Sequence, residues 1–223
     1  MGRYMRPMLQ DRVLFIDGEA IVIDKPAGLP VDRPRDGARS LEDMLGELTF
    51  GFKRLPLPVH RLDRDTSGCL LLARNPKAHA RFQQAFEAGA VTKRYLAVLE
   101  REPEADSGTI DLPLIKTSTI EEGWRMRGDP SGKRAVTRWK VLQRRKGRAL
   151  VAFFPETGRT HQIRVHAADG LGIPILGDSV YGAGGPAMLL HAVELTVPRE
   201  GKPDVHGHAP LPVRFHNNGF GDG

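Results

Sequence analysis

The sequence has little cysteine and no long apolar run. Cys69 is its one cysteine, which excludes an internal disulfide framework and a zinc site built mainly from thiolates. The segment Met1 to Gln10 carries charges without an apolar core, and no apolar stretch approaches the roughly 20 residues that a membrane helix requires. We therefore expect a soluble, cytoplasmic protein without a membrane partner.

Motifs for nucleotide cofactors and for metals are also missing. Gly182, Gly184 and Gly185 have neither the spacing nor the preceding strand of a phosphate-binding or dinucleotide-binding loop. The histidines considered as metal ligands are His60, His161, His166 and His191. No pair of them has the i, i+4 spacing of a zinc-binding helix, and the sequence contains no HExxH. We expect no metal, and favour phosphate contacts or structural hydrogen bonds as their roles.

What the chain does have is positive charge and enough apolar residues for a substantial core. Its 33 Lys and Arg exceed its 27 Asp and Glu, which favours a polyanionic partner such as RNA. Of its 223 residues, 40% are apolar, which supports one core or at most two small lobes that share a cleft. We expect a single catalytic domain over residues 1–223, in which 199–223 form a partly irregular tail.

Strand signals outnumber helix signals. We expect strands or extended segments at 12–16, 20–24, 59–63, 68–73, 91–99, 135–143, 149–154 and 188–197, and helices at 40–51, 75–89 and 160–169. Asp17-Gly18 accepts the positive φ angles of a tight hairpin turn, and Asn75-Pro76 is typical of a helix start. Since strands and helices do not alternate regularly, the fold class is α+β with a mostly antiparallel mixed sheet and flanking helices.

Ionisable residues are concentrated just before the buried strand at 68–73, in His60-Arg-Leu-Asp-Arg-Asp-Thr-Ser-Gly68. In an extended chain, Arg61 and Asp63 share a face and Leu62 points into the core. A guanidinium nearby lowers the pKa of a carboxyl, so Asp63 would be ionised and available as a nucleophile or a base. The alternative is a structural ion pair at the start of a strand.

A second concentration of polar residues runs from Thr157 to His166, Thr-Gly-Arg-Thr-His-Gln-Ile-Arg-Val-His. In a helix, His161 and Arg164 lie three residues apart, and Gln162 and His166 lie four apart. Polar groups then appear on more than one face, which is poorly suited to simple burial. The alternative is a solvated surface helix.

These segments, taken in order, resemble the motifs of RluA-type pseudouridine synthases. The matching motifs are His60-Arg-Leu-Asp-Arg-Asp-Thr-Ser-Gly68, Lys93-Arg-Tyr95, Gly158-Arg-Thr-His-Gln-Ile-Arg-Val-His166 and Pro174-Ile-Leu-Gly-Asp-Ser-Val-Tyr-Gly182. Asp24-Lys-Pro-Ala-Gly28 and Leu189-Leu-His-Ala192 are similar to further family segments. The resemblance covers residues 12 to 215 and implies the pseudouridine synthase fold with a central RNA-binding cleft.

The resemblance also implies residue roles. The essential aspartate maps to Asp63 rather than Asp65, a tyrosine that packs against the target base maps to Tyr95, and an arginine that pairs with the catalytic carboxylate maps to Arg164. Arg61 is expected to help fill the space that the extruded nucleotide leaves. The other residues expected to contact substrate are His60, Thr66, Lys93, Arg159, His161 and Leu190, the last as an apolar wall of the pocket.

The implied reaction isomerises uridine to pseudouridine in structured RNA, without a cofactor. The enzyme breaks the N1–C1′ bond, turns the uracil and rejoins it through C5, so a carboxylate serves at the sugar or the base. Because Asp24-Lys-Pro-Ala-Gly28 lies close to residue 1, we expect no separate S4 RNA-binding domain. That is similar to the short branch that acts on tRNA anticodon arms, large-subunit ribosomal RNA, or both. We expect a monomer that binds RNA.

Two other functions compete with this one. The first is a catalytically inactive RNA-binding or ribosome-assembly factor on the same scaffold, which shares the basic surface and does not require Asp63. The more distant alternative is a metal-dependent hydrolase, which excess chelator would inactivate.

Smaller expectations concern single residues outside these roles. We expect Cys69 to be a buried apolar residue and Trp139 to belong to the core. Trp124 is expected in a loop, where it could either pack against the protein or stack on a base. Asp178 and Tyr181 lie in a family motif, and their role could be only to shape the loop.

Overall fold

A computed structural model describes residues 8–119 and 123–221, and the chain divides into two compact units. Unit 1 comprises Met1–Val91 and Glu194–Ala209, and unit 2 comprises Thr92–Val193 and Pro210–Gly223. The expected single domain spans both, and most of the segment Met1 to Gln10 lies outside the described residues. No helix in the described ranges is long and apolar enough to cross a membrane.

Unit 1 is built on antiparallel strands. Its elements are η1 (Leu9–Arg12), β1 (Val13–Ile16), β2 (Ala20–Lys25), η2 (Glu42–Leu48), β3 (Leu57–Pro58), β4 (Ser67–Ala73), α1 (Pro76–Glu87), the second half of β11 (Leu190–Val197) and β12 (Val205–His208). β2 pairs with both β1 and β4, β3 pairs with β4, and β11 pairs with β12. Every residue of β4 is buried, as its continuous apolar sequence predicts.

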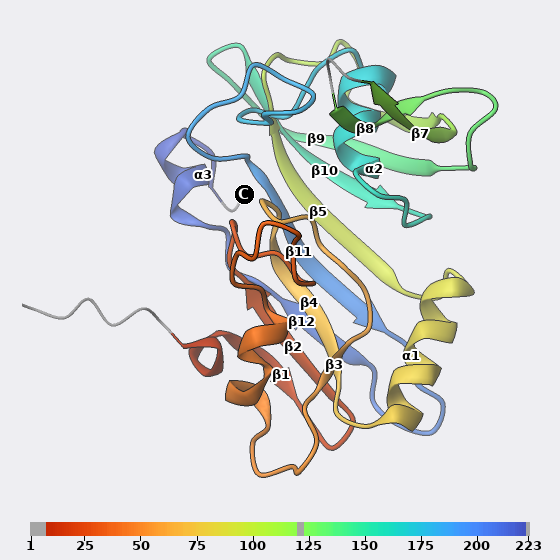
Figure 1. Cartoon of the computed structure of the whole chain (residues 1–223). Helices are drawn as coiled ribbons and strands as arrows, with labels where there is room; N and C mark the ends of the chain where they lie inside the picture. Colours follow the sequence, from red (N-terminus) through yellow and green to blue (C-terminus); the bar gives the residue numbers. More distant parts are fainter. Residues whose placement is uncertain (1–7, 120–122, 222–223) are drawn as a thin grey trace, which may run out of the picture. The chain divides into compact units, whose positions relative to one another are not determined.

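Helix α1 covers one face of these strands (Figure 1). The Asn75 side chain accepts a hydrogen bond from the Ala78 N–H at 2.9 Å, and Pro76 occupies the first helical turn, which confirms the predicted helix start. Ala78 and Phe82 then pack against Leu71 of β4. The helix holds the strand that follows the 60–66 segment in place.

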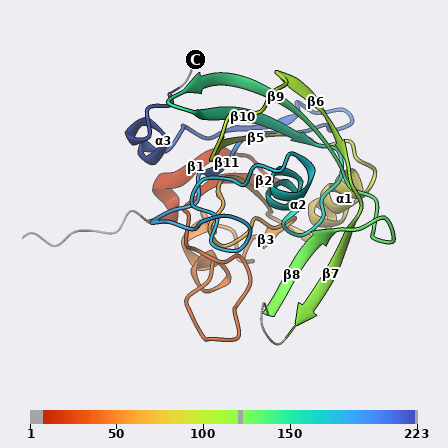
Figure 2. The same cartoon turned by 90° about the horizontal axis from the view of Figure 1, so that it is seen from above.

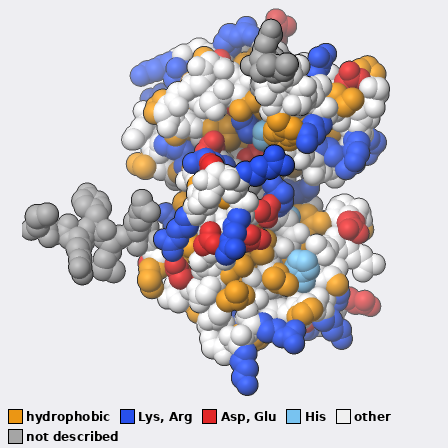
Figure 3. Space-filling model, viewed as in Figure 1, with side chains coloured by type: hydrophobic (Ala, Val, Ile, Leu, Met, Phe, Trp, Pro, Cys, Tyr) orange, Lys and Arg blue, Asp and Glu red, His pale blue; other side chains and the backbone are white. Residues whose placement is uncertain are grey.

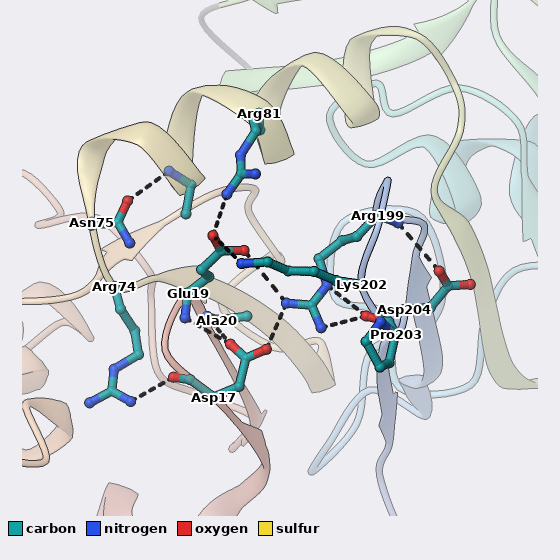
Figure 4. Close-up of polar contacts among 11 residues, drawn as sticks. Asp17, Glu19, Ala20, Arg74, Asn75, Arg81, Arg199, Lys202, Pro203 and Asp204 are labelled. Carbon is teal, nitrogen blue, oxygen red and sulfur yellow. Dashed lines mark hydrogen bonds and ion pairs between the residues drawn. The ribbon is translucent and has the colours of Figure 1, made fainter.

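The turn between β1 and β2 is closed by a side chain rather than by a left-handed glycine. Gly18 does not have the positive φ that we expected. Instead Asp17 Oδ1 accepts the N–H groups of Glu19 and Ala20, each at 2.8 Å. Asp17 also pairs with Arg199 at 2.6 Å (Figure 4). The side chain supplies the local hydrogen bonds that make a turn, so the glycine conformation is not needed.

Around this turn an ion network ties separate parts of unit 1 together (Figure 4). Glu19 accepts from Arg81 of α1 at 2.5 Å and from Lys202 at 2.9 Å. Arg74 donates to the Asp17 carbonyl at 2.6 Å. The network joins the β1–β2 turn, the start of α1 and the β11–β12 turn.

Unit 2 is also built mainly on antiparallel strands. Its elements are β5 (Thr92–Leu99), β6 (Ser107–Asp111), β7 (Leu114–Thr119), β8 (Gly123–Gly128), β9 (Val136–Arg145), β10 (Arg148–Pro155), α2 (Gln162–Val165), η3 (His166–Gly170), the first half of β11 and α3 (Val213–Asn217). β5, β10, β9 and β6 are neighbours in that order, and β7 pairs only with β8 among the strands that the structure describes. Figure 2 shows the β7–β8 hairpin extending away from β9 and β10.

The expected α+β class with mostly antiparallel strands is confirmed, and several local expectations are wrong. Residues 59–63 form no strand. The helix expected over 40–51 is the 3-10 helix η2, although its start has the predicted contact from the Ser40 hydroxyl to Asp43 at 2.9 Å. The tail over 199–223, expected to be partly irregular, contains two short elements that were not predicted, β12 and α3. Strands β6, β7 and β8 were not predicted.

Candidate functional site

Asp63 lies in a tight turn of unit 1, directly before the buried strand β4. Its carbonyl accepts the Thr66 N–H at 3.1 Å. Leu62 is buried, as predicted, while Asp63 is half-buried and Asp65 is exposed. The segment is thus anchored by one apolar side chain, and the Asp63 carboxylate is partly withdrawn from solvent.

Lys25 fixes the backbone of this turn, a role that sequence reasoning missed. The Lys25 side chain is fully buried, and its Nζ donates to the carbonyls of Pro26, Leu29 and Arg64 at 2.9, 2.8 and 3.1 Å. The Gly28 N–H donates to the same Arg64 carbonyl at 2.8 Å. One ammonium therefore joins the loop after β2 to the Asp63 turn. The signal in the sequence was the Asp24-Lys-Pro-Ala-Gly28 segment.

The other predicted residues of this segment differ in burial and in their contacts. His60 Nε2 accepts the Leu71 N–H at 3.0 Å, and its ring stacks on Phe86 with centroids 4.7 Å apart. Arg61 is exposed and pairs with Asp32 at 2.8 Å. Thr66 is buried, and within the described residues its Oγ1 has no hydrogen-bond partner. Arg61 is therefore the more accessible of these three side chains.

In unit 2 the predicted helix over 160–169 is shorter and irregular. His161 precedes α2 in the left-handed region, with φ of 53°, and α2 runs into the π-helical turn η3. Gln162 is buried and closes the preceding loop, because its Oε1 accepts from the Thr157 hydroxyl at 2.7 Å and the Arg159 N–H at 2.9 Å. The segment is neither a regular helix nor a solvated surface helix.

Arg164 and Asp178 form a buried ion pair. Arg164 Nε lies 2.7 Å from Asp178 Oδ2 and its Nη2 lies 2.8 Å from Oδ1, with side chains 7% and 0% exposed. Asp178 Oδ1 also accepts the backbone N–H groups of Val180 and Tyr181. Burial alone raises the pKa of Asp178, but these hydrogen bonds and the charge of Arg164 outweigh it and lower the pKa. Asp178 thus holds Arg164 as well as its own loop.

The residue before Asp178 must be glycine for this loop to close. Gly177 has a φ of 82°, a region that favours glycine. A Cβ at this position would lie 2.0 Å from the Ala187 carbonyl oxygen. The close approach of the two chain segments lets Asp178 reach Arg164 of α2.

A row of rings leads outward from Arg164. The Arg164 guanidinium carbon lies 5.1 Å from the centre of the Tyr181 ring. The Tyr181 hydroxyl is 2.8 Å from His161 Nδ1 and accepts the Met126 N–H at 3.0 Å. The Trp124 ring meets the His161 ring edge-on, with centroids 5.1 Å apart. Trp124 lies in β8 rather than in a loop and is 41% exposed.

The remaining predicted residues of unit 2 differ in accessibility. Tyr95 is half-buried and packs against the same core cluster as Leu190, which is buried. Lys93 is half-buried, and its Nζ donates to the Thr157 carbonyl at 3.4 Å. Burial lowers the pKa of Lys93. Arg159 is exposed and donates from Nε to the Arg134 carbonyl at 3.0 Å.

The predicted residues fall into two sets, one in each unit. His60, Arg61, Asp63 and Thr66 belong to unit 1, and Lys93, Tyr95, Arg159, His161, Arg164 and Leu190 belong to unit 2. Over residues 8–119 and 123–221, no group of three or more His, Cys, Asp or Glu side chains is arranged to hold a metal ion.

Comparisons with known proteins agree on one family. A family model for RNA pseudouridylate synthase matches residues 19–169. An RNA pseudouridine synthase of Zymomonas mobilis is 59% identical over 96% of this chain and 100% of its own length. The ribosomal large subunit pseudouridine synthase D of the same organism is 36% identical over 76% of this chain and 55% of its own. The structure of human RNA pseudouridylate synthase domain containing 4 matches with a TM-score of 0.79 and 27% identity, covering 93% of this chain and 91% of that one.

Proposed function

This chain belongs to the RNA pseudouridylate synthase family and forms pseudouridine in RNA, and we propose that Asp63 is the carboxylate that its reaction requires. The reaction breaks the N1–C1′ bond of a uridine and joins C5 of the same uracil to C1′, so a proton leaves C5 and one returns to N1. A carboxylate serves as the nucleophile at C1′ or as the base that removes the C2′ proton. Both routes require Asp63 to be ionised.

The observation that carries this proposal is the local structure of the turn. Asp63 is half-buried and precedes a fully buried strand, and its turn is fastened by the Lys25 ammonium through the Arg64 carbonyl. Asp65 belongs to the same segment and is exposed. A reacting group must be held in one geometry, and a fastened backbone with a partly desolvated carboxylate meets that requirement better than an exposed one.

Tyr95 and Arg164 are the further catalytic residues that we propose. Tyr95 has one side packed on the core and remains half-buried, which leaves ring surface for the target base. Arg164 is held by two hydrogen bonds to Asp178, so its guanidinium keeps one orientation. Arg61, which is exposed, suits a side chain that enters an RNA stack when a nucleotide leaves it.

The remaining substrate-contact predictions are unequally supported. Lys93, Arg159 and His161 carry polar groups at the surface or partly exposed, and we keep them as RNA contacts. His60 is held by a structural hydrogen bond, and Thr66 and Leu190 are buried. We therefore expect these three residues to affect substrate binding indirectly, through the position of the neighbouring backbone and side chains.

The substrate that we propose is a uridine extruded from a folded RNA, in a tRNA anticodon arm, in large-subunit ribosomal RNA, or in both. Flipping a nucleotide out of its stack costs a few kcal/mol, which stacking and phosphate contacts offset. Lys and Arg side chains are spread over the visible face in Figure 3, which supports contacts along an RNA backbone. The relative named for the ribosomal large subunit supports the ribosomal choice.

The test of the catalytic assignment compares Asp63→Asn with Asp65→Asn. We expect Asp63→Asn to abolish pseudouridine formation and to change RNA affinity by less than about tenfold, since one charge contributes roughly 1 kcal/mol to such binding. Asp65→Asn, two residues away and exposed, should retain activity. Tritium release from RNA labelled at uridine C5 measures the reaction. An active Asp63→Asn enzyme would refute the assignment.

The RNA target is found by profiling pseudouridine in total tRNA and ribosomal RNA from cells with and without the gene. The positions that lose pseudouridine in the deletion strain are the substrates. Restoration by the parent gene and not by the Asp63→Asn gene ties each position to the enzyme. A lost position outside tRNA anticodon arms and large-subunit ribosomal RNA would contradict the proposed substrate class.

A further inference from the structure

One face of the β7–β8 hairpin is buried at one end and exposed to solvent at the other. Leu114, Lys116 and Ser118 of β7 lie opposite Gly128, Met126 and Trp124 of β8. At one end Leu114 is buried and Met126 packs with Val165 and Tyr181 in a small core cluster. At the other end Trp124 is 41% exposed. The described part of the protein therefore anchors this face at one end and leaves a large aromatic ring in solvent at the other.

The exposed Trp124 ring is the outer end of the row that leads to Arg164. Trp124 contacts His161, His161 is hydrogen-bonded to Tyr181, and the Tyr181 ring lies beside the Arg164 guanidinium. All of these residues belong to unit 2. A nucleotide resting on Trp124 would therefore lie a few side chains from a residue that we assign to the reaction.

The same hairpin carries three basic residues, Lys116 in β7 and Arg125 and Arg127 in β8. Lys116 Nζ is 5.5 Å from the centre of the Trp124 ring, and the Arg125 guanidinium carbon is 5.3 Å from the Tyr181 ring centre. Arg125 and Arg127 also line a hollow of about 440 Å³ together with Met126, Gly128, Leu112 and Asp169. Asp169 is the acidic residue there, and its carboxylate accepts the Gly128 N–H at 2.8 Å. Over residues 114–128 the sequence has Lys116, Arg125 and Arg127 against Glu121 and Glu122, and the described strands of the hairpin combine an exposed ring with these three basic residues.

We propose that Trp124 stacks on an unpaired base of the RNA substrate that flanks the modified uridine, while Lys116, Arg125 and Arg127 contact the adjoining phosphates. This deepens the proposed function and rests on Arg164 belonging to the reaction. Surfaces that bind single-stranded nucleic acid combine aromatic rings for base stacking with basic residues along the backbone. A duplex does not expose the faces of its bases for stacking, and the three basic residues would contribute less binding free energy to a protein partner than to a phosphate backbone. Unpaired RNA is therefore the partner that fits the hairpin.

Fluorescence reports directly on the proposed contact. The chain has two tryptophans, and Trp139 is buried in the core. A short single-stranded oligouridylate should quench the emission of the parent protein, and the quenching should disappear in Trp124→Phe, where only Trp139 emits. Absence of quenching in the parent, or equal quenching in Trp124→Phe, overturns the proposal. Equal quenching by an RNA duplex of the same length also overturns it.

Affinity gives an independent measurement. Trp124→Ala should weaken binding of the oligouridylate by about tenfold, within the range measured for loss of one stacked base. Lys116→Ala should weaken binding less and reduce its salt dependence by about one phosphate contact. Leu142→Ala, an exposed apolar side chain on β9 of the same unit, is the matched control and should bind as the parent does. An affinity of Trp124→Ala for the oligouridylate within twofold of that of the parent would contradict the proposal. Trp124→Leu, which fills space without an aromatic ring, serves if the alanine variant does not fold.

The outcome is separable from that of the proposed function. The binding series is repeated in the Asp63→Asn background, where no reaction is expected. If Asp63→Asn proves active while Trp124→Ala still weakens binding, the catalytic assignment fails and the hairpin contact stands. If Asp63→Asn is inactive and Trp124→Ala binds normally, the catalytic assignment stands and the hairpin contact fails.

Discussion

Removal of the Asp178 carboxylate should destabilise the fold far more than removal of a surface carboxylate. In Asp178→Ala the Arg164 guanidinium, 7% exposed, loses both hydrogen bonds to that carboxylate. The N–H groups of Val180 and Tyr181 lose their acceptor as well. Breaking a buried ion pair by removing one partner costs about 3–5 kcal/mol. For a chain of this size, each kcal/mol lowers the melting temperature by about 2–4 °C.

We therefore expect the melting temperature of Asp178→Ala to fall by about 10 °C, measured by circular dichroism at constant pH and salt. The matched control is Glu156→Ala. Glu156 pairs with Arg138 at 3.1 Å in the same unit, but the two side chains are 44% and 63% exposed. Such surface pairs contribute about 0–1 kcal/mol, so the control should melt within about 4 °C of the parent.

A double variant separates the ion pair from other effects of the substitution. Arg164→Met combined with Asp178→Leu removes both charges of the pair. It should be more stable than Asp178→Ala, because the buried guanidinium that lost its two hydrogen bonds to Asp178 is removed as well. Equal melting temperatures for Asp178→Ala and Glu156→Ala would refute the reasoning, since burial would then make no difference to the value of the pair.

Two further predictions follow from buried titratable groups. His166 is buried between the Thr137 hydroxyl at 2.9 Å and the Leu112 carbonyl at 3.0 Å, and burial lowers its pKa below 6.5. Because the unfolded chain then binds the extra proton, stability should fall as pH drops below about 6.5. His166→Gln, which keeps a donor and an acceptor, should lose less of its melting temperature over that range; parallel curves for the two proteins would contradict this. Burial raises the pKa of Cys69 to about 12, so a thiol reagent at neutral pH should leave the folded protein unlabelled and label it in denaturant, and rapid labelling of the native protein would show the thiol to be accessible.

Part of the candidate site could be predicted from sequence, because a motif identifies residues even when the contacts around them are unknown. The segments around Asp63, Tyr95 and Arg164 were found in this way, and the family that they resemble is confirmed. The contacts around them were not found. Arg164 is held by Asp178, which is 14 residues further along the chain, and the Asp63 turn is fastened by Lys25, 39 residues before Arg64. A sequence pattern carries no information on which distant polar groups meet.

Elements with strong local signals could be predicted from the sequence. β4 is a continuous apolar run, and α1 begins with a capping asparagine followed by proline, so neither depends on a distant partner for its identity. The other elements depend on contacts between distant parts of the chain. The β7–β8 hairpin is polar and half exposed, and β12 is stable because it pairs with β11 and packs Val205 into a core cluster. Such short segments gain their free energy from burial against residues far away in the chain, which is why their own sequences do not predict them.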